Sequence, residues 1–260
     1  MAKIGETCRG VVLRATDVGD NDRLLTLLTA EHGRITVSAK GARSLKSRYM
    51  PVSQQFAYAD FTFTERGGYR WLSDAALLES FFSVRRNLPT LALACYCMSV
   101  TESLALENSP DPELLRLILN TLHILCGEKY PVTHVKAVFE FSAAACGGFM
   151  PESAECGSCG TQKELAFLDT VGGVVLCRDC AKRAEEREGN NMLPAALFPV
   201  SPGMLDAVRY VTSPDTKNIF SFRLPEEEER AFCSLSEQYL LAQLDCSFKT
   251  LSFFHEVNDG

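Results

Sequence analysis

The sequence predicts an α+β fold in which a small five-stranded barrel precedes an α-helical bundle with an inserted zinc-ribbon-like module. Three observations lead to this prediction. Short β-type runs fill the first 80 residues, helical spacing takes over near Leu77, and two Cys-x-x-Cys pairs interrupt the helical part. We therefore expect a barrel domain at residues 1–80 and a helical domain at 81–260, with the zinc module at 150–185.

The first 80 residues contain five predicted strands, at 8–15, 23–29, 34–39, 54–64 and 69–72. Residues 54–64 alternate in polarity, so that Ala57, Ala59, Phe61 and Phe63 share one face. Five short antiparallel strands with one long irregular connection fit a partly open barrel such as the OB-fold. An SH3-like barrel would give much the same pattern, so periodicity leaves both open.

Helical spacing begins at about Leu77, and five helices are predicted at 87–107, 111–125, 131–147, 202–211 and 225–246. The second of these has the clearest start signal. Asp111 is suited to accept hydrogen bonds from the first turn, and Pro112 is favoured at the first helical position. The helices are too apolar to stand alone, so we expect them to pack as one bundle.

Four cysteines between the third and fourth predicted helices have the spacing of a zinc site. They form the pairs Cys156/Cys159 and Cys177/Cys180, separated by 17 residues. A short hairpin is expected between the pairs, at 165–168 and 173–176. Four thiolates would fill a tetrahedral shell and leave no open position, so one structural zinc ion is predicted. The alternative is four ordinary cysteines, either reduced or in disulfides.

A basic segment follows the third strand and is a candidate for contact with nucleic acid. It places Lys40, Arg43, Lys46 and Arg48 within nine residues, and no acidic residue lies between His32 and Ala59. Spaced cations of this kind neutralise phosphate groups. Arg14 and Arg34, together with Arg66 and Arg70, are expected to extend the patch, and the candidate base-stacking side chains are Tyr58, Tyr69 and Trp71. A solvated polar loop is the alternative.

Charge and composition limit the remaining function classes. The net charge is −7, but residues 1–80 carry 11 Lys and Arg against 9 acidic residues, so the excess of negative charge lies after residue 80. No nucleotide-binding loop, dinucleotide fingerprint or hydrolase motif is present, so no catalytic residues are assigned and an enzyme is not expected. The 11 cysteines, several within helical stretches, are typical of free thiols in a reducing compartment, and no signal peptide or membrane helix is predicted. A cytoplasmic protein is therefore expected.

The order of several short motifs resembles the RecO family of bacterial recombination mediators over nearly the whole chain. The N-terminal stretch at 33–43 carries the most characteristic motif. The other motifs are Gly10-Val-Val-Leu13, the strand at 22–29, Phe139-Glu-Phe141, Gly148-Phe-Met-Pro151, Gly172-Gly173 and Phe248-Lys-Thr-Leu-Ser252, the last with Thr250 where serine is more usual.

The resemblance implies an N-terminal OB-fold, a helical bundle carrying the zinc module, and a role in the RecF pathway of DNA repair and homologous recombination. RecO-type proteins bind single- and double-stranded DNA, anneal complementary strands, and with RecR help to load RecA on DNA coated by single-stranded-DNA-binding protein (SSB). They use no nucleotide or small-molecule substrate, do not bind membranes, and associate with the nucleoid during repair. Many dock the acidic C-terminal tail of SSB, for which Arg85 and Arg86 beside Leu88, or Arg116 and Lys136, are alternative candidates.

Two rival functions remain open at the level of sequence. An RNA-binding OB/zinc-ribbon protein would discriminate through the 2′-hydroxyl group. A protein-interaction adaptor without nucleic-acid activity would show neither salt-dependent DNA binding nor strand annealing. A zinc hydrolase is disfavoured because the predicted ligand set is closed.

Overall fold

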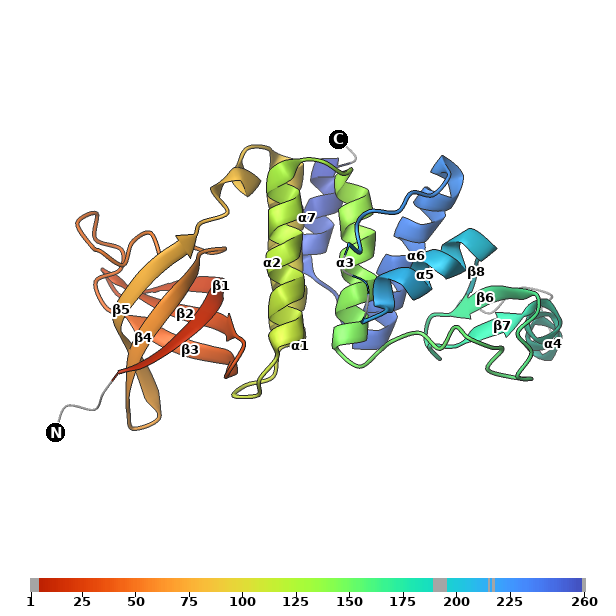
Figure 1. Cartoon of the computed structure of the whole chain (residues 1–260), viewed down its shortest axis with the longest axis horizontal. Helices are drawn as coiled ribbons and strands as arrows, with labels where there is room; N and C mark the ends of the chain where they lie inside the picture. The colour runs from red at the N-terminus through yellow and green to blue at the C-terminus, as the bar shows by residue number, and fades with distance from the viewer. Residues whose placement is uncertain (1–4, 189–195, 215, 217, 259–260) are drawn as a thin grey trace. The chain divides into compact units, whose positions relative to one another are not determined.

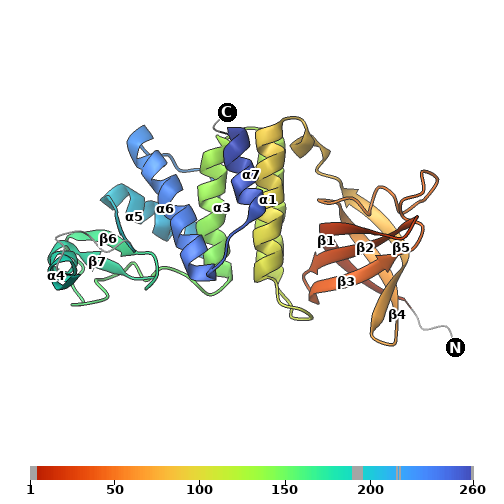
Figure 2. The same ribbon diagram turned by 180° about the vertical axis from the view of Figure 1, so that it is seen from behind.

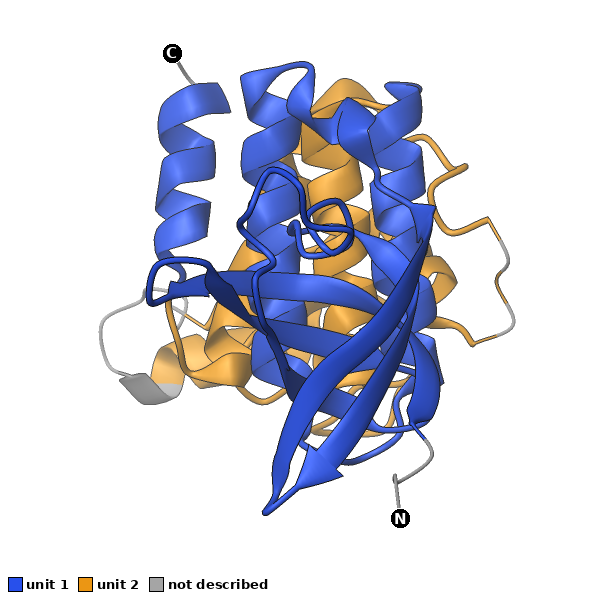
Figure 3. Ribbon diagram, turned by 90° about the vertical axis from the view of Figure 1, so that its left-hand side faces the viewer, with its two compact units in different colours: residues 1–129, 248–260 blue, residues 130–247 orange. Residues whose placement is uncertain are grey.

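The structure is a computed structural model, and it describes residues 5–188, 196–214, 216 and 218–258. These residues form two compact units (Figure 3). Unit 1 comprises residues 1–129 and 248–260, and unit 2 comprises residues 130–247. The chain therefore leaves unit 1 after its second long helix and returns to it for the last one. Division into domains at residue 80 stays a prediction.

Unit 1 begins with a closed five-stranded barrel, whose strands are β1 (Glu6–Val18), β2 (Asp22–Thr29), β3 (Gly33–Ala39), β4 (Tyr58–Arg66) and β5 (Tyr69–Glu79). The strand order is β1-β2-β3-β5-β4, and β1 pairs with β4 to close the barrel (Figure 1). The β3–β5 pairing is parallel, and the other four pairings are antiparallel. This connectivity is that of an OB-type barrel, so the predicted fold class is confirmed.

The barrel core follows the strand alternation that the sequence predicts. Ala59, Phe61 and Phe63 of β4 are at most 1% exposed, and they pack with the inward side chains of the other strands. Ala42 and Val52, from the long connection between β3 and β4, belong to the same cluster. The connection therefore contributes to the core although it forms neither strand nor helix.

Strand β5 is longer than predicted. It continues to Glu79 because Leu77 pairs with Ala59 and extends the ladder beyond the barrel core. A short 3₁₀ helix, η1 (Phe82–Arg85), then connects it to the first long helix. The prediction that helical structure begins near Leu77 was wrong, because the leucines there continue a strand at its exposed end.

Three helices complete unit 1: α1 (Leu88–Leu104), α2 (Pro112–Gly127) and α7 (Lys249–Asn258). Helix α2 starts as predicted, with Asp111 accepting a hydrogen bond from the Leu114 N–H at 3.0 Å. Helix α7 packs against α1 (Figure 2). Just before α7, the centre of the Phe248 ring lies 5.7 Å from that of the Tyr96 ring in α1. The sequence pattern did not resolve α7 as a separate helix.

Unit 2 contains α3 (Val132–Cys146), α5 (Pro202–Thr212) and α6 (Glu226–Leu244), so the helices predicted as one bundle are shared between the two units. Helix α3 is buried along most of its length against α6. It carries a buried ion pair between Lys136 Nζ and Glu140 Oε1 at 2.9 Å, and Glu237 of α6 lies 2.6 Å from the same ammonium group. Lys136 is 3% exposed, so it cannot serve as a surface cation for an acidic peptide.

The rest of unit 2 is a small module of four elements: β6 (Leu165–Asp169), β7 (Val175–Cys177), α4 (Arg178–Glu188) and β8 (Leu197–Pro199). The predicted hairpin corresponds to β6 and β7, while α4 and β8 were not predicted. The sheet order is β7-β6-β8. Across the described part of the chain, no helix combines the length and the apolar character needed to cross a membrane.

Candidate metal centre and nucleic-acid interface

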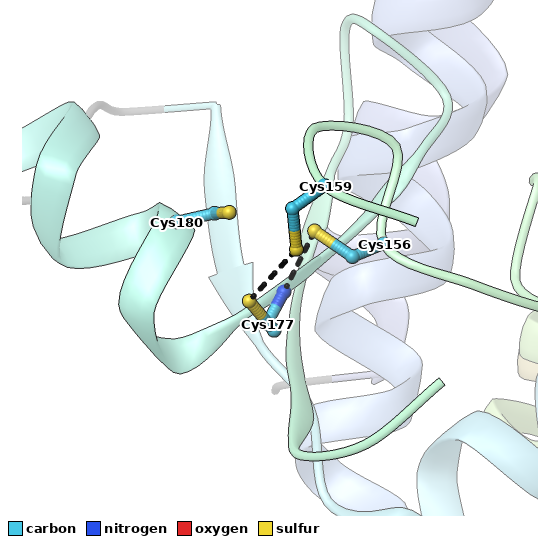
Figure 4. Close-up of side chains that lie close together, drawn as sticks. All are labelled: Cys156, Cys159, Cys177 and Cys180. Atoms are coloured by element: carbon cyan, nitrogen blue, oxygen red, sulfur yellow. Dashed lines mark hydrogen bonds between the residues drawn. The ribbon is translucent and has the colours of Figure 1, made fainter. Parts of the chain in front are cut away.

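The structure brings together all four cysteines of the predicted metal site. The sulfur atoms of Cys156, Cys159, Cys177 and Cys180 all lie within 4.8 Å of one another (Figure 4). The first two belong to the turn before β6, and the last two to the junction of β7 and α4. All eleven cysteines fall within the described residues and none forms a disulfide. The cluster therefore has the ligand type and closeness of a metal site.

Hydrogen-bond donors surround these sulfur atoms. The Cys177 N–H donates to Cys156 Sγ at 3.4 Å, and the guanidinium group of Arg183 donates to Cys180 Sγ at 2.8 Å. Burial disfavours the Cys156 thiolate, but N–H groups of Cys177, Ser158 and Cys159 together outweigh it and lower the pKa of Cys156 to about 6. Donors of this kind stabilise the thiolate form that binds metal ions.

Arg183 was not identified from the sequence, although a signal was present. It stands three residues after Cys180 in α4, and residues at this spacing lie on the same face of a helix. Four thiolates around a divalent ion leave a net negative charge, which a neighbouring guanidinium group offsets.

The predicted DNA-binding cations fall into three groups in the structure. Arg14 and Arg34 are directed at the helices of unit 1. Arg14 forms an ion pair with Glu102 of α1 at 2.8 Å, and Arg34 donates to the Glu102 carbonyl at 2.9 Å. Arg34 also lies 3.4 Å from Glu107. These two side chains connect the barrel to α1, and the Arg14 side chain is still 61% exposed, so their contact with phosphates stays a prediction.

Arg43 and Arg48 hold the long β3–β4 connection in place. Arg43 donates to the carbonyl groups of Gly19 and Asp20 at 3.0 and 3.1 Å, and it pairs with Asp17 at 3.2 Å. Arg48 donates to the Ser73 carbonyl at 2.8 Å, and its guanidinium group stacks over Tyr49. Both arginines are exposed, so they hold the loop in place and their contact with phosphates stays a prediction.

Lys40 and Lys46 are the predicted cations whose charge no carboxylate among the described residues offsets, whereas the four predicted arginines each form an ion pair. Both are exposed. Lys46 makes no ion pair with any other described residue, and the ammonium group of Lys40 lies 4.7 Å from the ring centre of Trp71. The ammonium group therefore lies over one face of the indole ring, and Trp71 itself is half-buried.

Trp71 belongs to a row of outward side chains that crosses four strands. The pairing register aligns Trp71 of β5 with Ser38 of β3 and with Thr64 of β4, and Ser38 with Leu24 of β2. Their sequence neighbours point into the core, so these four side chains share the outer face. Leu24 is 40% exposed.

A second pair on β4 and β5 extends this surface. Arg66 is aligned with Tyr69, two positions along from the Thr64–Trp71 pair, and Tyr69 is 72% exposed. Arg70, by contrast, is aimed at Glu65 and Asn108, and Tyr58 is only partly exposed.

We define the outer barrel face as Leu24, Ser38, Lys40, Thr64, Arg66, Tyr69 and Trp71. Aromatic rings and cations on one OB face suit single-stranded nucleic acid.

The geometry defines an OB-type protein with a four-cysteine metal module. Comparison with known proteins agrees with this class. Residues 1–81 match the family model described as "Recombination protein O N terminal", and residues 85–252 match that of "Recombination protein O C terminal". The chain belongs to the RecO family of DNA repair proteins.

Relatives with the name "DNA repair protein RecO" match over most of their length. The protein from Myxococcus xanthus is 32% identical over 209 residues, covering 80% of this chain and 84% of the relative. The protein from Acetivibrio thermocellus is 26% identical over 250 residues and covers 96% of each chain. The Bacillus subtilis protein is 26% identical over 232 residues, covering 89% of this chain and 87% of the relative.

Proposed function

We propose that this chain is a recombination mediator of the RecF pathway, which binds single- and double-stranded DNA at the outer barrel face and anneals complementary strands. With RecR, it would help to load RecA on SSB-coated DNA in the bacterial cytoplasm, at the nucleoid during repair. The presence of Lys40, Trp71 and the exposed Tyr69 on one barrel face supports the proposal, because cations and aromatic rings side by side match the backbone and the bases of a single strand.

Annealing requires two polyanions to approach while their base edges stay free to pair. Lys40 and Lys46 would neutralise phosphates, and Tyr69, which is 72% exposed, would stack on a base without reading its identity. Every base has a flat face, so this mode of binding tolerates any sequence. Contacts to phosphates make the affinity fall with salt concentration.

We further propose that the four-cysteine cluster holds one zinc ion with a structural role. Zinc takes four thiolate ligands in a tetrahedral arrangement, and such closed sites stabilise small modules rather than activate water. The chain thus has no position for a metal-bound nucleophile at this site, which supports a function without catalysis.

For the acidic tail of SSB, we propose the predicted surface at Arg85, Arg86 and Leu88, together with the neighbouring Phe82. Arg85 is half-buried and donates to the Gln55 carbonyl at 2.9 Å, so Arg86 is the exposed cation of this surface. Phe82 is 70% exposed and Leu88 is 52% exposed, so apolar side chains and a cation are available together. The other candidate pair is weakened, because Lys136 is buried and Arg116 stands 4.0 Å from Glu113.

The double variant Lys40→Ala/Lys46→Ala tests the DNA interface without disturbing the loop contacts. We expect roughly tenfold weaker binding of single-stranded oligonucleotides at low salt, and a salt slope smaller by about 1 for each lysine removed. The chain has one tryptophan, so quenching of Trp71 fluorescence and oligonucleotide anisotropy give two readouts of the same event.

A matched control, Lys163→Ala/Lys249→Ala, removes the same charge from two exposed lysines away from the barrel face. It should leave affinity and salt slope near those of the wild type. Equal effects of the two double variants would contradict the proposed interface. Competition between DNA and RNA oligonucleotides of one sequence separates this function from RNA binding, which predicts a preference for RNA.

A further inference from the structure

One apolar side chain in the β3–β4 connection projects almost fully into solvent. Leu45 is 90% exposed, the highest value among the large apolar side chains of the described residues. It occupies a central position of the turn that the Ser47 N–H closes by donating to the Ser44 carbonyl at 2.8 Å. Lys46 is the other central residue of this turn. Single exposed leucines are common on protein surfaces, but this one is carried by a turn that is anchored on both sides.

The turn that carries Leu45 is anchored on its N-terminal side. The Gly41 N–H donates to the Asp22 carboxylate at 2.7 Å, and the Arg43 N–H donates to the Asn21 carbonyl at 3.0 Å. The Arg43 side chain binds two further carbonyl groups of the β1–β2 turn. Ala42, between these anchors, is completely buried in the barrel core.

The C-terminal side of the turn is anchored separately. The Tyr49 hydroxyl donates to the Ser73 carbonyl of β5 at 2.6 Å, and Arg48 donates to the same oxygen. Val52 then enters the barrel core. Leu45 and Lys46 thus form the apex of an arch whose two ends are fixed to different strands of the barrel. A side chain presented by such a frame loses little conformational freedom when it meets a partner.

The charge around the apex selects the kind of partner. Lys40, Arg43, Lys46 and Arg48 surround Leu45 in the sequence. In the structure Arg43 pairs with Asp17 and Arg48 with Asp74, so Lys46, beside Leu45, is the cation of the turn that no carboxylate among the described residues offsets. A polyanion is attracted to such a segment. The apolar surface that a nucleic acid offers is the face of its bases, and leucine is among the side chains that enter base steps as wedges.

We propose that Leu45 is a wedge that inserts against or between DNA bases while Lys46 beside it binds a phosphate group. This inference rests on the proposed DNA-binding function and adds a specific action to it. By separating stacked bases, Leu45 would keep a bound strand open to its complement. The alternative is that Leu45 inserts into an apolar pocket of a protein partner, and the fluorescence of Leu45→Ser complexes with DNA separates the two.

The test uses the full chain and oligonucleotides that carry 2-aminopurine, whose fluorescence rises when it is unstacked. Wild-type protein should raise the fluorescence of a bound single strand at least about twofold. Leu45→Ser should lose most of this rise at saturating protein, with oligonucleotide anisotropy still reporting binding. Leu45→Phe should keep the rise, because a ring also enters a base step. Val171→Ser removes another exposed apolar side chain, 67% exposed and outside the barrel, and should behave as wild type.

An equal fluorescence rise for Leu45→Ser and wild type, at equal saturation, would overturn the wedge and leave DNA binding intact. That result would assign Leu45 to a protein partner or to no partner. Failure of the wild type to bind any oligonucleotide would overturn the proposed function as well as the wedge. Leu45 is so exposed that its replacement should not change the thermal midpoint, and coincident melting curves confirm that the variants are folded.

Discussion

Replacing Gly33 by alanine is expected to destabilise unit 1 by about 3 kcal/mol or more, because two penalties coincide at this residue. Its φ is +61°, and an added Cβ would lie 1.8 Å from the Ser109 carbonyl oxygen and 2.8 Å from that of Leu106. The backbone carbonyls belong to the α1–α2 connection, so they cannot yield without displacing it. Urea unfolding followed by Trp71 fluorescence measures the loss, since Trp71 lies in the same unit.

Gly41→Ala is the matched control for this variant. Gly41 has a similar φ of +66°, but no atom lies within 4 Å of an added Cβ. The control should cost only the backbone penalty, about 1 kcal/mol. Equal losses for the two variants would show that the close approach at Gly33 does not matter for stability. The expected result explains the Gly33–Arg34 pair as a structural junction between barrel and helices.

Removal of the proposed zinc is expected to unfold the four-cysteine module. Apparent binding energies of structural zinc sites are about 10–16 kcal/mol, far above what a module of three short strands and one helix gains from its own core. Cys177→Ser, or treatment of the wild type with a strong chelator, should abolish one bound zinc per chain and expose residues 150–188 to proteolysis. Metal analysis and mass spectrometry of the fragments measure both effects.

The control for metal removal is Cys246→Ser, a cysteine outside the cluster. It should keep the metal and the protease resistance. The barrel belongs to unit 1, so its Trp71 fluorescence should stay native in Cys177→Ser. A wild-type protein without bound zinc, or a Cys177→Ser variant that keeps both metal and resistance, would contradict the structural assignment.

The barrel and the cysteine cluster were predictable because their signals are local in sequence. Alternation from Ala57 to Phe63 reflects the two faces of one strand, and each Cys-x-x-Cys pair fits within a single turn. The prediction at the end of β5 was wrong for a reason that is also local in sequence. The pattern at Leu77 and Leu78 is typical of a helix start. In the structure both residues lie at the end of strand β5, where their side chains are partly exposed.

The roles of the basic residues were not predictable from the sequence, because their partners are distant in the chain. Arg34 donates to Glu102, which is 68 residues away, and Arg43 binds carbonyl groups more than 20 residues before it. Composition treats these arginines and Lys46 as equal cations. Only tertiary structure separates those that hold the fold together from those that face solvent.

The same limit applies to Lys136 on α3. Its spacing from Glu140 permits an exposed i, i+4 ion pair, which helices commonly carry on their surface. The packing of α6 buries this pair and adds Glu237. A cation that appears available in the sequence is therefore part of the interior of unit 2.

A small cationic surface on the barrel is proposed to bind DNA backbones regardless of sequence. The equilibrium affinity of the wild-type chain for two unrelated single-stranded oligonucleotides of equal length, measured across a range of sodium chloride concentrations, tests this binding mode. We expect the logarithm of the binding constant to fall linearly with the logarithm of salt concentration, with the same slope for both oligonucleotides. No binding at low salt, or an affinity that differs strongly between sequences and ignores salt, would contradict it.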